Sequence, residues 1–268
     1  MSEVKDLLEK DRYSFEDLQS IMKILRSENG CPWDKEQNFK SIRNNIIEEV
    51  YEFVEGVDTD NKELMCEELG DVLLQIVFHA EMAREENSFT INEVCDGICK
   101  KLILRHPHIF ADTVVSGSGD VLKNWDSIKM VEKGQKNVSD QMSHISKALP
   151  SLIRSSKIGQ KAAKVGFDFS DAKEALVKVK EELSEVEVEL EKNDEKATFE
   201  EFGDLLFSVV NAARLAGINA EEALYFANEK FLNRFSKLEN EIEVSGKNFS
   251  ELSLTEMDQI WNRIKIKC

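Results

Sequence analysis

The stretch EELGDVLLQIVFHA, residues 67–80, decides the fold of this chain. At 100° per residue, its polar side chains fall on one narrow stripe of a helix, which is formed by Glu68, Asp71, Gln75 and His79. Apolar side chains occupy the rest of the circle. A helix that is apolar on nearly all sides is buried, so Glu68 and Asp71 are expected to be buried or to face an internal cleft.

The pattern occurs a second time in EEFGDLLFSVVNAA, residues 200–213, where Glu201 and Asp204 share a stripe with Ser208 and Asn211. Other features recur in the same order. They are the acidic clusters EEVYE and EELSE (48–52 and 181–185), the basic pairs Lys101 with Arg105 and Lys230 with Arg234, and the Trp-x-x-Ile-Lys segments at 125–129 and 261–265. This internal repeat predicts two tandem domains, residues 1–134 and 135–268.

Both domains are predicted to be helical. Residues 71–86 and 176–192 have the helical pattern, and no period-two alternation is long enough for a sheet. Ser116–Gly119 is expected to form an exposed loop inside the first half, and the polar stretch 132–146 to connect the halves. The expected fold class is therefore all-α, with two tandem helical-bundle domains.

The composition narrows the possible partners. The net charge of −17 argues against binding to nucleic acid or anionic membranes, and no apolar run has the length of a membrane span. The charged N-terminus does not resemble a signal peptide, and five cysteines without close pairs favour a reducing cytoplasm over a disulfide scaffold. An acidic chain that handles phosphate needs metal ions or a local cationic cluster.

Carboxylates that lie inside a helical bundle need compensating charge, because burying a bare carboxylate costs several kcal/mol. Divalent cations supply that charge and prefer oxygen ligands. Two pairs at i, i+3 supply the facing acids, so that each half offers four carboxylates to magnesium: Glu49, Glu52, Glu68 and Asp71 in the first, Glu182, Glu185, Glu201 and Asp204 in the second. A di-iron site is disfavoured, because no histidine follows a glutamate by three residues.

Basic and aromatic residues complete the candidate site. Lys230 with Arg234, and Lys101 with Arg105, could neutralise phosphate oxygens, or could form surface salt bridges with the many acids. Trp125 and Trp261 could each stack on a base or fill a core. The chain has neither a Gly-x-x-x-x-Gly-Lys loop nor a nucleophile elbow, so phosphate is not cradled in P-loop fashion.

The succession Glu-Glu-x-x-Glu, Glu-x-x-Asp and Lys-x-x-x-Arg resembles the MazG family of nucleoside triphosphate pyrophosphohydrolases. The resemblance runs from about residue 18 to 267 and includes GCPWD (30–34), RHPH (105–108), VGFD (165–168) and ANEKF (227–231). It implies the all-α NTP pyrophosphohydrolase fold, a homodimer, and hydrolysis of ribo- and deoxynucleoside triphosphates to monophosphate and pyrophosphate. Such an activity would serve nucleotide-pool housekeeping.

The resemblance also implies roles for individual residues. Glu182, Glu185, Glu201 and Asp204 would ligate Mg²⁺, for which Mn²⁺ could substitute. Five positions would contact the nucleotide: Lys178, Glu181, Lys230, Arg234 and Trp261. Relatives with two domains would carry the main activity in the second half. The first half retains its own acids and basic pair, but four extra residues separate Asp71 from that pair.

The expected mechanism is metal-assisted attack of water on the α-phosphorus, with Glu181 as the candidate to orient or deprotonate the water. Two alternatives remain. One is a helical nucleotide-binding or protein-interaction module without catalysis. The other is a hydrolase restricted to one substrate, such as dUTP or an alarmone.

Overall fold

The computed structural model describes residues 2–135 and 137–267, and within these residues it contains helices and no strand. The all-α prediction is thereby confirmed. The chain divides into two compact units, Met1–Lys129 and Met130–Cys268, and the division falls in the last turn of a helix, α8. The domain boundary predicted between residues 134 and 135 lies just beyond the end of that helix.

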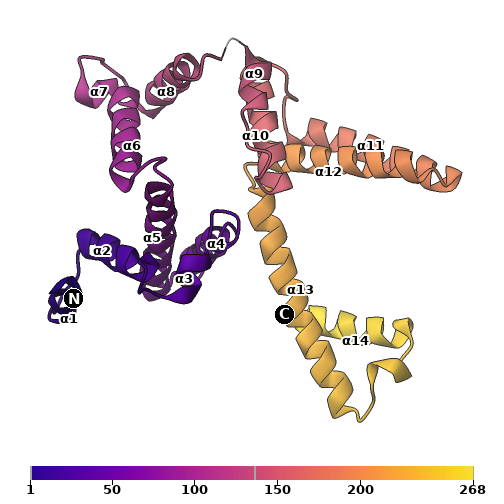
Figure 1. Ribbon diagram of the computed structural model, residues 1–268. Helices are drawn as coiled ribbons and strands as arrows, with labels where there is room; N and C mark the ends of the chain where they lie inside the picture. Colours follow the sequence, from indigo (N-terminus) through magenta and orange to yellow (C-terminus); the bar gives the residue numbers. More distant parts are fainter. Residues whose placement is uncertain (1, 136, 268) are drawn as a thin grey trace. The chain divides into compact units, whose positions relative to one another are not determined.

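The first unit is built around the long helix α5, Lys62–Glu85 (Figure 1). Antiparallel to it and beside it lies α4, Asn45–Asp58, and α2, Phe15–Arg26, also packs on it. The remaining helices are α1 (Ser2–Leu8), α3 (Pro32–Glu36), α6 (Ile91–Arg105), α7 (Pro107–Phe110) and α8 (Ser118–Glu132). The core of this unit consists of Met22, Ile42, Val77, Phe78 and Met82.

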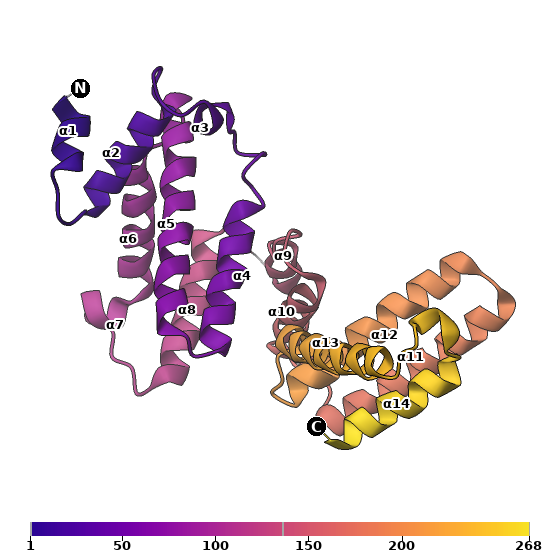
Figure 2. The same cartoon turned by 90° about the horizontal axis from the view of Figure 1, so that it is seen from below.

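The second unit repeats the helix pair. The most extensive helix–helix contact of this unit is between α11, Ala172–Lys192, and α12, Glu195–Leu215. The two helices run antiparallel (Figure 2). The other elements are α9 (Val138–Ser143), α10 (Ser151–Ala163), α13 (Ala220–Val244), the 3₁₀ turn η1 (Phe249–Glu251) and α14 (Leu254–Lys267). A small core of Leu238, Ile242 and Ile264 joins α13 to α14.

Matching turns set the register of the two helix pairs. The side chain of Asn61 accepts hydrogen bonds from the first backbone amides of α5, and Asp194 does the same for α12. These N-caps satisfy amides that have no partner within the helix. Because each turn between the paired helices is short, the acids of the first helix are held opposite those of the second.

The expectation that the apolar ring of these helices is buried on all sides is wrong for the single chain. On α12, Leu206 is 57% exposed and Phe202 45% exposed, and Leu69 on α5 is 52% exposed. The physical reason is that each pair packs one helix on another and leaves a second apolar face uncovered. The acids between the paired helices are therefore shielded only by the contact between the two helices of their own pair.

Other expectations meet small corrections. Ser118 and Gly119 belong to α8, so the predicted loop is limited to its first residues, and α9 lies within the expected linker. Cys66, Cys95 and Cys99 are exposed free thiols, and Cys31 is a half-buried one, whereas Cys268 lies outside the described residues. Among the helices described, none is long and apolar enough to cross a membrane.

Candidate metal and nucleotide site

Each helix pair brings carboxylates of its two helices together. In the first half, one oxygen each of Glu49, Glu68 and Asp71 lie within 4.8 Å of one another. In the second half the same holds for Glu182, Glu201 and Asp204. These six residues are members of the two predicted metal-ligand sets, so the helix pairs place them as a shared ion would require.

The first-half centre, defined as Glu49, Glu68 and Asp71, contains buried oxygens that have no partner. Glu68 is 6% exposed, and its Oε2 atom accepts no hydrogen bond from any described group. Gln75 lies two turns further along the stripe and is equally buried, and its Oε1 atom also lacks a partner. Buried polar atoms are nearly always satisfied, so these two indicate a missing ligand.

Electrostatics in this centre favour protonation when no cation is present. Burial is the main cause that raises the pKa of Glu68, and the charges of Glu52, Asp71 and Glu49 add to it. The pKa of Glu49 is raised in the same way, mainly by burial and then by Asp71 and Glu52. Glu52 is exposed, yet it is close enough to act on both of these carboxyls. A divalent cation would relieve this repulsion.

The second-half centre, defined as Glu182, Glu201 and Asp204, has a different neighbour. The ammonium of Lys178 lies 2.7 Å from Oε1 of Glu182 and 2.8 Å from Oε1 of Glu181. These hydrogen bonds raise the pKa of Lys178 above its ordinary value. Glu182 is 6% exposed, so the lysine serves as the counter-ion of a buried carboxylate.

Glu185 adjoins this centre without being one of its three closest oxygens. Its pKa is raised, first by burial and then by a hydrogen bond and charge repulsion from Glu182. Asp204 and Glu185 are exposed, whereas Glu201 is half-buried. The second centre is therefore open to solvent along one side, as a site for a soluble substrate needs to be.

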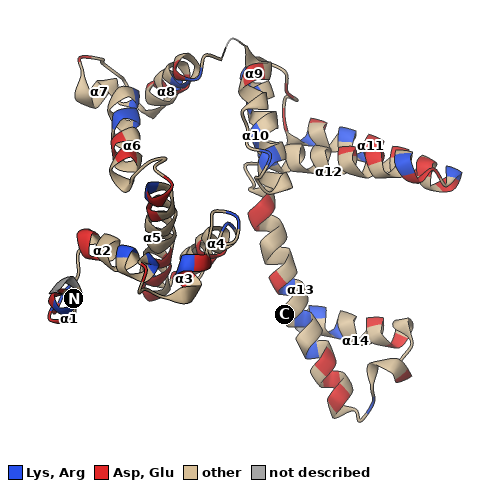
Figure 3. Cartoon of the chain, viewed as in Figure 1, with Lys and Arg blue, Asp and Glu red and all other residues tan. Residues whose placement is uncertain are grey.

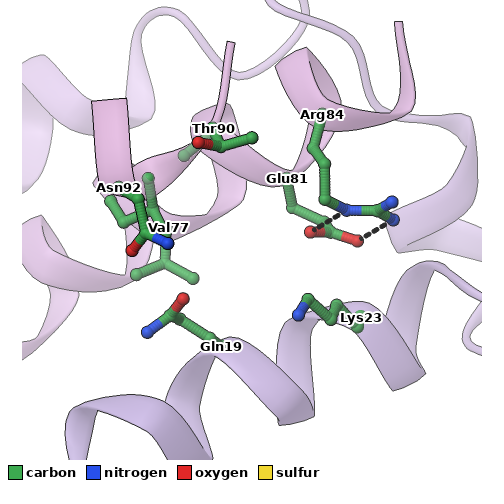
Figure 4. Close-up of a pocket in the computed structure, with 9 residues that line it drawn as sticks. Gln19, Lys23, Val77, Glu81, Arg84, Thr90 and Asn92 are labelled. Carbon is green, nitrogen blue, oxygen red and sulfur yellow. Dashed lines mark hydrogen bonds and ion pairs between the residues drawn. The ribbon is translucent and has the colours of Figure 1, made fainter. Parts of the chain in front are cut away.

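A polar cavity elsewhere in the first unit contains a buried carboxylate in a different condition from those of the two centres. This cavity of about 160 Å³ lies between α2, α5 and the start of α6, away from the predicted site residues (Figure 4). There the buried carboxylate of Glu81 receives two hydrogen bonds from Arg84, at 2.9 and 2.6 Å. A carboxylate satisfied by a neighbouring guanidinium needs no metal, and this is the condition that Glu68 lacks.

The basic pair of the second half does not lie beside the carboxylates of its own chain. Lys230 and Arg234 belong to α13, which leaves the end of α12 and runs away from the α11–α12 pair (Figure 1). Asp204 lies about 16 Å before the end of α12, and Lys230 about 15 Å beyond the start of α13, at 1.5 Å per residue. Lys230 is exposed, and Nε of Arg234 is buried without a partner.

In the first half, Lys101 is exposed on α6, and the guanidinium of Arg105 lies over the Trp125 ring, 5.5 Å from its centroid. The His106 ring also meets Trp125 edge-on, with centroids 4.9 Å apart. Trp125 is thus covered by residues of its own half. Acidic side chains are spread over most helices of both units (Figure 3).

Trp261 has a more open environment. Its ring lies 5.1 Å from that of Phe231, at the edge of an apolar cavity of about 310 Å³ between α13, η1 and α14. Asp258 is the charged residue in its lining. A planar base could stack here, so the substrate role predicted for Trp261 is sterically possible.

Two histidines, His79 and His106, have packing roles. His79 stacks on Phe39, with ring centroids 5.7 Å apart, and burial lowers its pKa. His106 caps the end of α6. Neither ring belongs to a carboxylate cluster among the residues that the structure describes.

Sequence reasoning missed several supporting contacts. Arg214 on α12 bonds to Asp168 at 2.6 Å and to Asn211 at 2.9 Å, which ties the VGFD segment to the acidic helix. The ion pair between Lys178 and Glu182 could have been found from their i, i+4 spacing. Gln75 was placed on the polar stripe, but its buried, unpartnered oxygen could not be inferred from spacing.

Comparison with known proteins finds one copy of the same domain in each half of the chain. The model of the MazG nucleotide pyrophosphohydrolase domain matches the chain twice, at residues 37–110 and 158–238. The chain is 44% identical over 251 residues to the nucleoside triphosphate pyrophosphohydrolase/pyrophosphatase MazG of Thermotoga maritima, covering 94% of this chain and 95% of that protein. It is 42% identical over 251 residues to the nucleoside triphosphate pyrophosphohydrolase of Escherichia coli K12, covering 92% and 95%.

Proposed function

The chain belongs to the MazG family of nucleotide pyrophosphohydrolases, and on that premise we propose that its second half hydrolyses nucleoside triphosphates with Mg²⁺ held by the α11–α12 pair. The reaction yields nucleoside monophosphate and pyrophosphate. The observation that carries the metal assignment is the meeting of Glu182, Glu201 and Asp204 within 4.8 Å on two facing helices.

The donor atoms fit magnesium. All three ligands are carboxylate oxygens, which hard cations prefer, and no histidine or cysteine belongs to either described cluster. The buried, unpartnered Oε2 of Glu68 supports a metal centre in the first half as well. Mn²⁺ has similar ligand preferences and is expected to substitute.

Bound magnesium would polarise the phosphate and lower the pKa of an attacking water. The chain's own residues then position the cation, the water and the substrate, and neutralise the charge of the phosphates. Glu182, Glu201, Asp204 and Glu185 would hold the cation. Glu181 is exposed beside this set and is our candidate for orienting the water, with Lys178 as its partner at 2.8 Å. Trp261 packs on Phe231, the neighbour of Lys230, and like Lys230 it would reach the carboxylates from a second copy of the chain, where it offers a stacking surface for the base.

We further propose that the protein acts as a homodimer. The α11–α12 pair exposes a row of large apolar side chains that includes Leu183, Phe202, Leu206 and Val209. An apolar face of this kind on a helix pair is covered when a second pair packs on it to form a four-helix arrangement. A second copy also offers Lys230 and Arg234 to the carboxylates, which their own chain does not, and the charges are complementary.

Broad base specificity and a cytoplasmic location are part of the same proposal. The apolar cavity beside Trp261 favours stacking, which every base allows, and the exposed free thiols suit a reducing compartment. The first-half set of Glu49, Glu52, Glu68 and Asp71, with Lys101 and Arg105, is proposed as a second metal centre. Arg105 lies against Trp125, which argues for a weaker nucleotide site there.

Pyrophosphate release from a panel of ribo- and deoxynucleoside triphosphates with Mg²⁺ tests the proposal. Glu201→Gln and Asp204→Asn should each lower turnover more than about 100-fold, since even outer-shell partners of a metal cost roughly 10–100-fold. Glu187→Gln, an exposed acid on α11, is the matched control and should leave turnover unchanged.

Each contrary result has a distinct meaning. Full turnover in Glu201→Gln would refute the ligand assignment. Binding of nucleotide without any product would favour the non-catalytic module, and release from one base alone would favour the restricted hydrolase.

A further inference from the structure

The two centres differ at one corresponding position. Equivalent acids are 133 residues apart, as Glu49 is from Glu182 and Glu68 from Glu201. At this spacing Lys178 corresponds to Asn45, the first residue of α4. The lysine contacts Glu182 at 2.7 Å, whereas in the described part of the first half no lysine or arginine forms an ion pair with Glu49, Glu68 or Asp71.

The first-half centre has a neutral neighbour in place of the cation. The side-chain amide of Gln75 forms a hydrogen bond with Glu49, and its Oε1 atom remains buried and without a partner. Oε2 of Glu68 is in the same condition. One unsatisfied oxygen within the three carboxylates and one on the amide beside them indicate that the missing ligand is a cation.

We propose that the first-half centre takes a divalent cation from solution without nucleotide, whereas in the second half the ammonium of Lys178 neutralises Glu182 until a nucleoside triphosphate draws that ammonium away. The second part of this inference rests on the proposed function. It assigns the two halves different roles: a standing metal centre in the first, and in the second a centre that takes its metal together with the substrate.

The reason is charge repulsion at close range. A divalent cation on Glu182 would stand within a few ångströms of the ammonium, and like charges at that distance repel strongly wherever water is partly excluded. Glu182 is buried, so screening there is weaker than at the surface. The ammonium must therefore move when metal binds.

The long lysine side chain permits that movement, and its new partner must be an anion. Glu181 is one partner, already at 2.8 Å, but it carries a single charge. The triphosphate carries several and approaches the same metal, so it can accept the displaced ammonium while it adds ligands to the cation. Lys178 is accordingly a substrate-binding residue that couples metal binding to substrate binding.

Titration of the full-length protein with Mn²⁺ alone, followed by the electron paramagnetic resonance signal of free Mn²⁺, tests this inference. The wild type should bind one Mn²⁺ per chain tightly. Glu68→Gln should abolish that binding and Glu201→Gln should not. Lys178→Gln should tighten a second class of site by on the order of tenfold, and Lys178→Arg should restore the wild-type pattern.

Two matched controls isolate the charge. Lys180→Gln removes the same charge from an exposed position on the same helix and should change nothing. Asn45→Lys recreates the i, i+4 spacing to Glu49 and should weaken the first class, whereas Asn45→Gln should not. Thermal melting of each variant confirms that it is folded.

The inference is overturned if the wild type fills both centres equally with Mn²⁺, or if Lys178→Gln and Lys180→Gln behave alike. Its failure is distinguishable from that of the proposed function. If pyrophosphate is released but the two centres bind Mn²⁺ with equal affinity, the inference is wrong and the proposed function stands. The predicted Mn²⁺ preference without pyrophosphate release would remove the proposed function and leave the first-half metal centre standing.

Discussion

Glu68 and Glu182 are both 6% exposed, yet their surroundings differ. The carboxylate of Glu182 contacts the ammonium of Lys178, whereas the charges that act on Glu68 are those of other acids, Glu52, Asp71 and Glu49 among them. A buried carboxylate without a counter-ion disfavours its charged form. The first half should therefore be the part of the protein whose stability depends most on pH and on metal.

For Glu68, burial raises the pKa above its ordinary value of 4.5. The neutral acid is the form that the fold favours, so this contribution to stability is complete below the ordinary value and is lost as pH rises through the raised pKa. In a chelator at neutral pH, Glu68→Gln should melt at a higher temperature than the wild type, and near pH 4 the difference should disappear.

Thermal melting monitored by circular dichroism between pH 4 and 8 measures this effect. Glu55→Gln, an exposed acid on α4, serves as the control and should follow the wild type. Added Mg²⁺ should stabilise the wild type and leave Glu68→Gln unaffected. Parallel pH profiles for the wild type and Glu68→Gln would show that Glu68 is not electrostatically strained.

At the scale of elements, α12 is the helix on which the second half depends. One face presents Glu201 and Asp204 to α11, and the opposite end packs on α10 through Asn211 and Arg214. Gly159 permits that packing, because a Cβ atom there would lie 2.9 Å from Oδ1 of Asn211 and 3.1 Å from Nε of Arg214. The Asn211 oxygen is held by hydrogen bonds from Arg214, so it cannot easily move away.

Gly159→Ala should therefore destabilise the second unit by about 1–3 kcal/mol, as overpacking of a well-packed contact does. Gly97→Ala, in α6, meets open space and should instead stabilise the first unit by roughly 0.5–1 kcal/mol, because alanine is the better helix former. Urea denaturation measures both. A stabilising effect of Gly159→Ala would mean that Arg214 and Asn211 rearrange freely.

At the scale of the whole molecule, the repeat, the helices and the acids that meet could all be predicted, because helical periodicity places Glu68 with Asp71 and Glu201 with Asp204 whatever surrounds them. The degree to which the apolar side chains of these helices are buried could not be predicted. Periodicity shows that Leu206 and Phe202 are on apolar faces, but it does not tell whether the covering surface comes from the same chain. The position of Lys230 relative to Asp204 likewise depends on the turn at residues 216–219, which local pattern does not determine.

Leu206→Glu tests whether a second copy covers the α11–α12 pair. In the single chain this side chain is 57% exposed, so a charge there costs little for folding of the monomer. If the face is an interface, the buried charge should weaken the dimer by at least about 2 kcal/mol, which sedimentation velocity would detect as a shift toward monomer. Turnover should fall with it, since Lys230 and Arg234 of the second copy would no longer reach the carboxylates. Val114→Glu, an exposed apolar position in the loop before α8, should change neither property. A monomeric wild type with full activity would contradict both the dimer and the shared site.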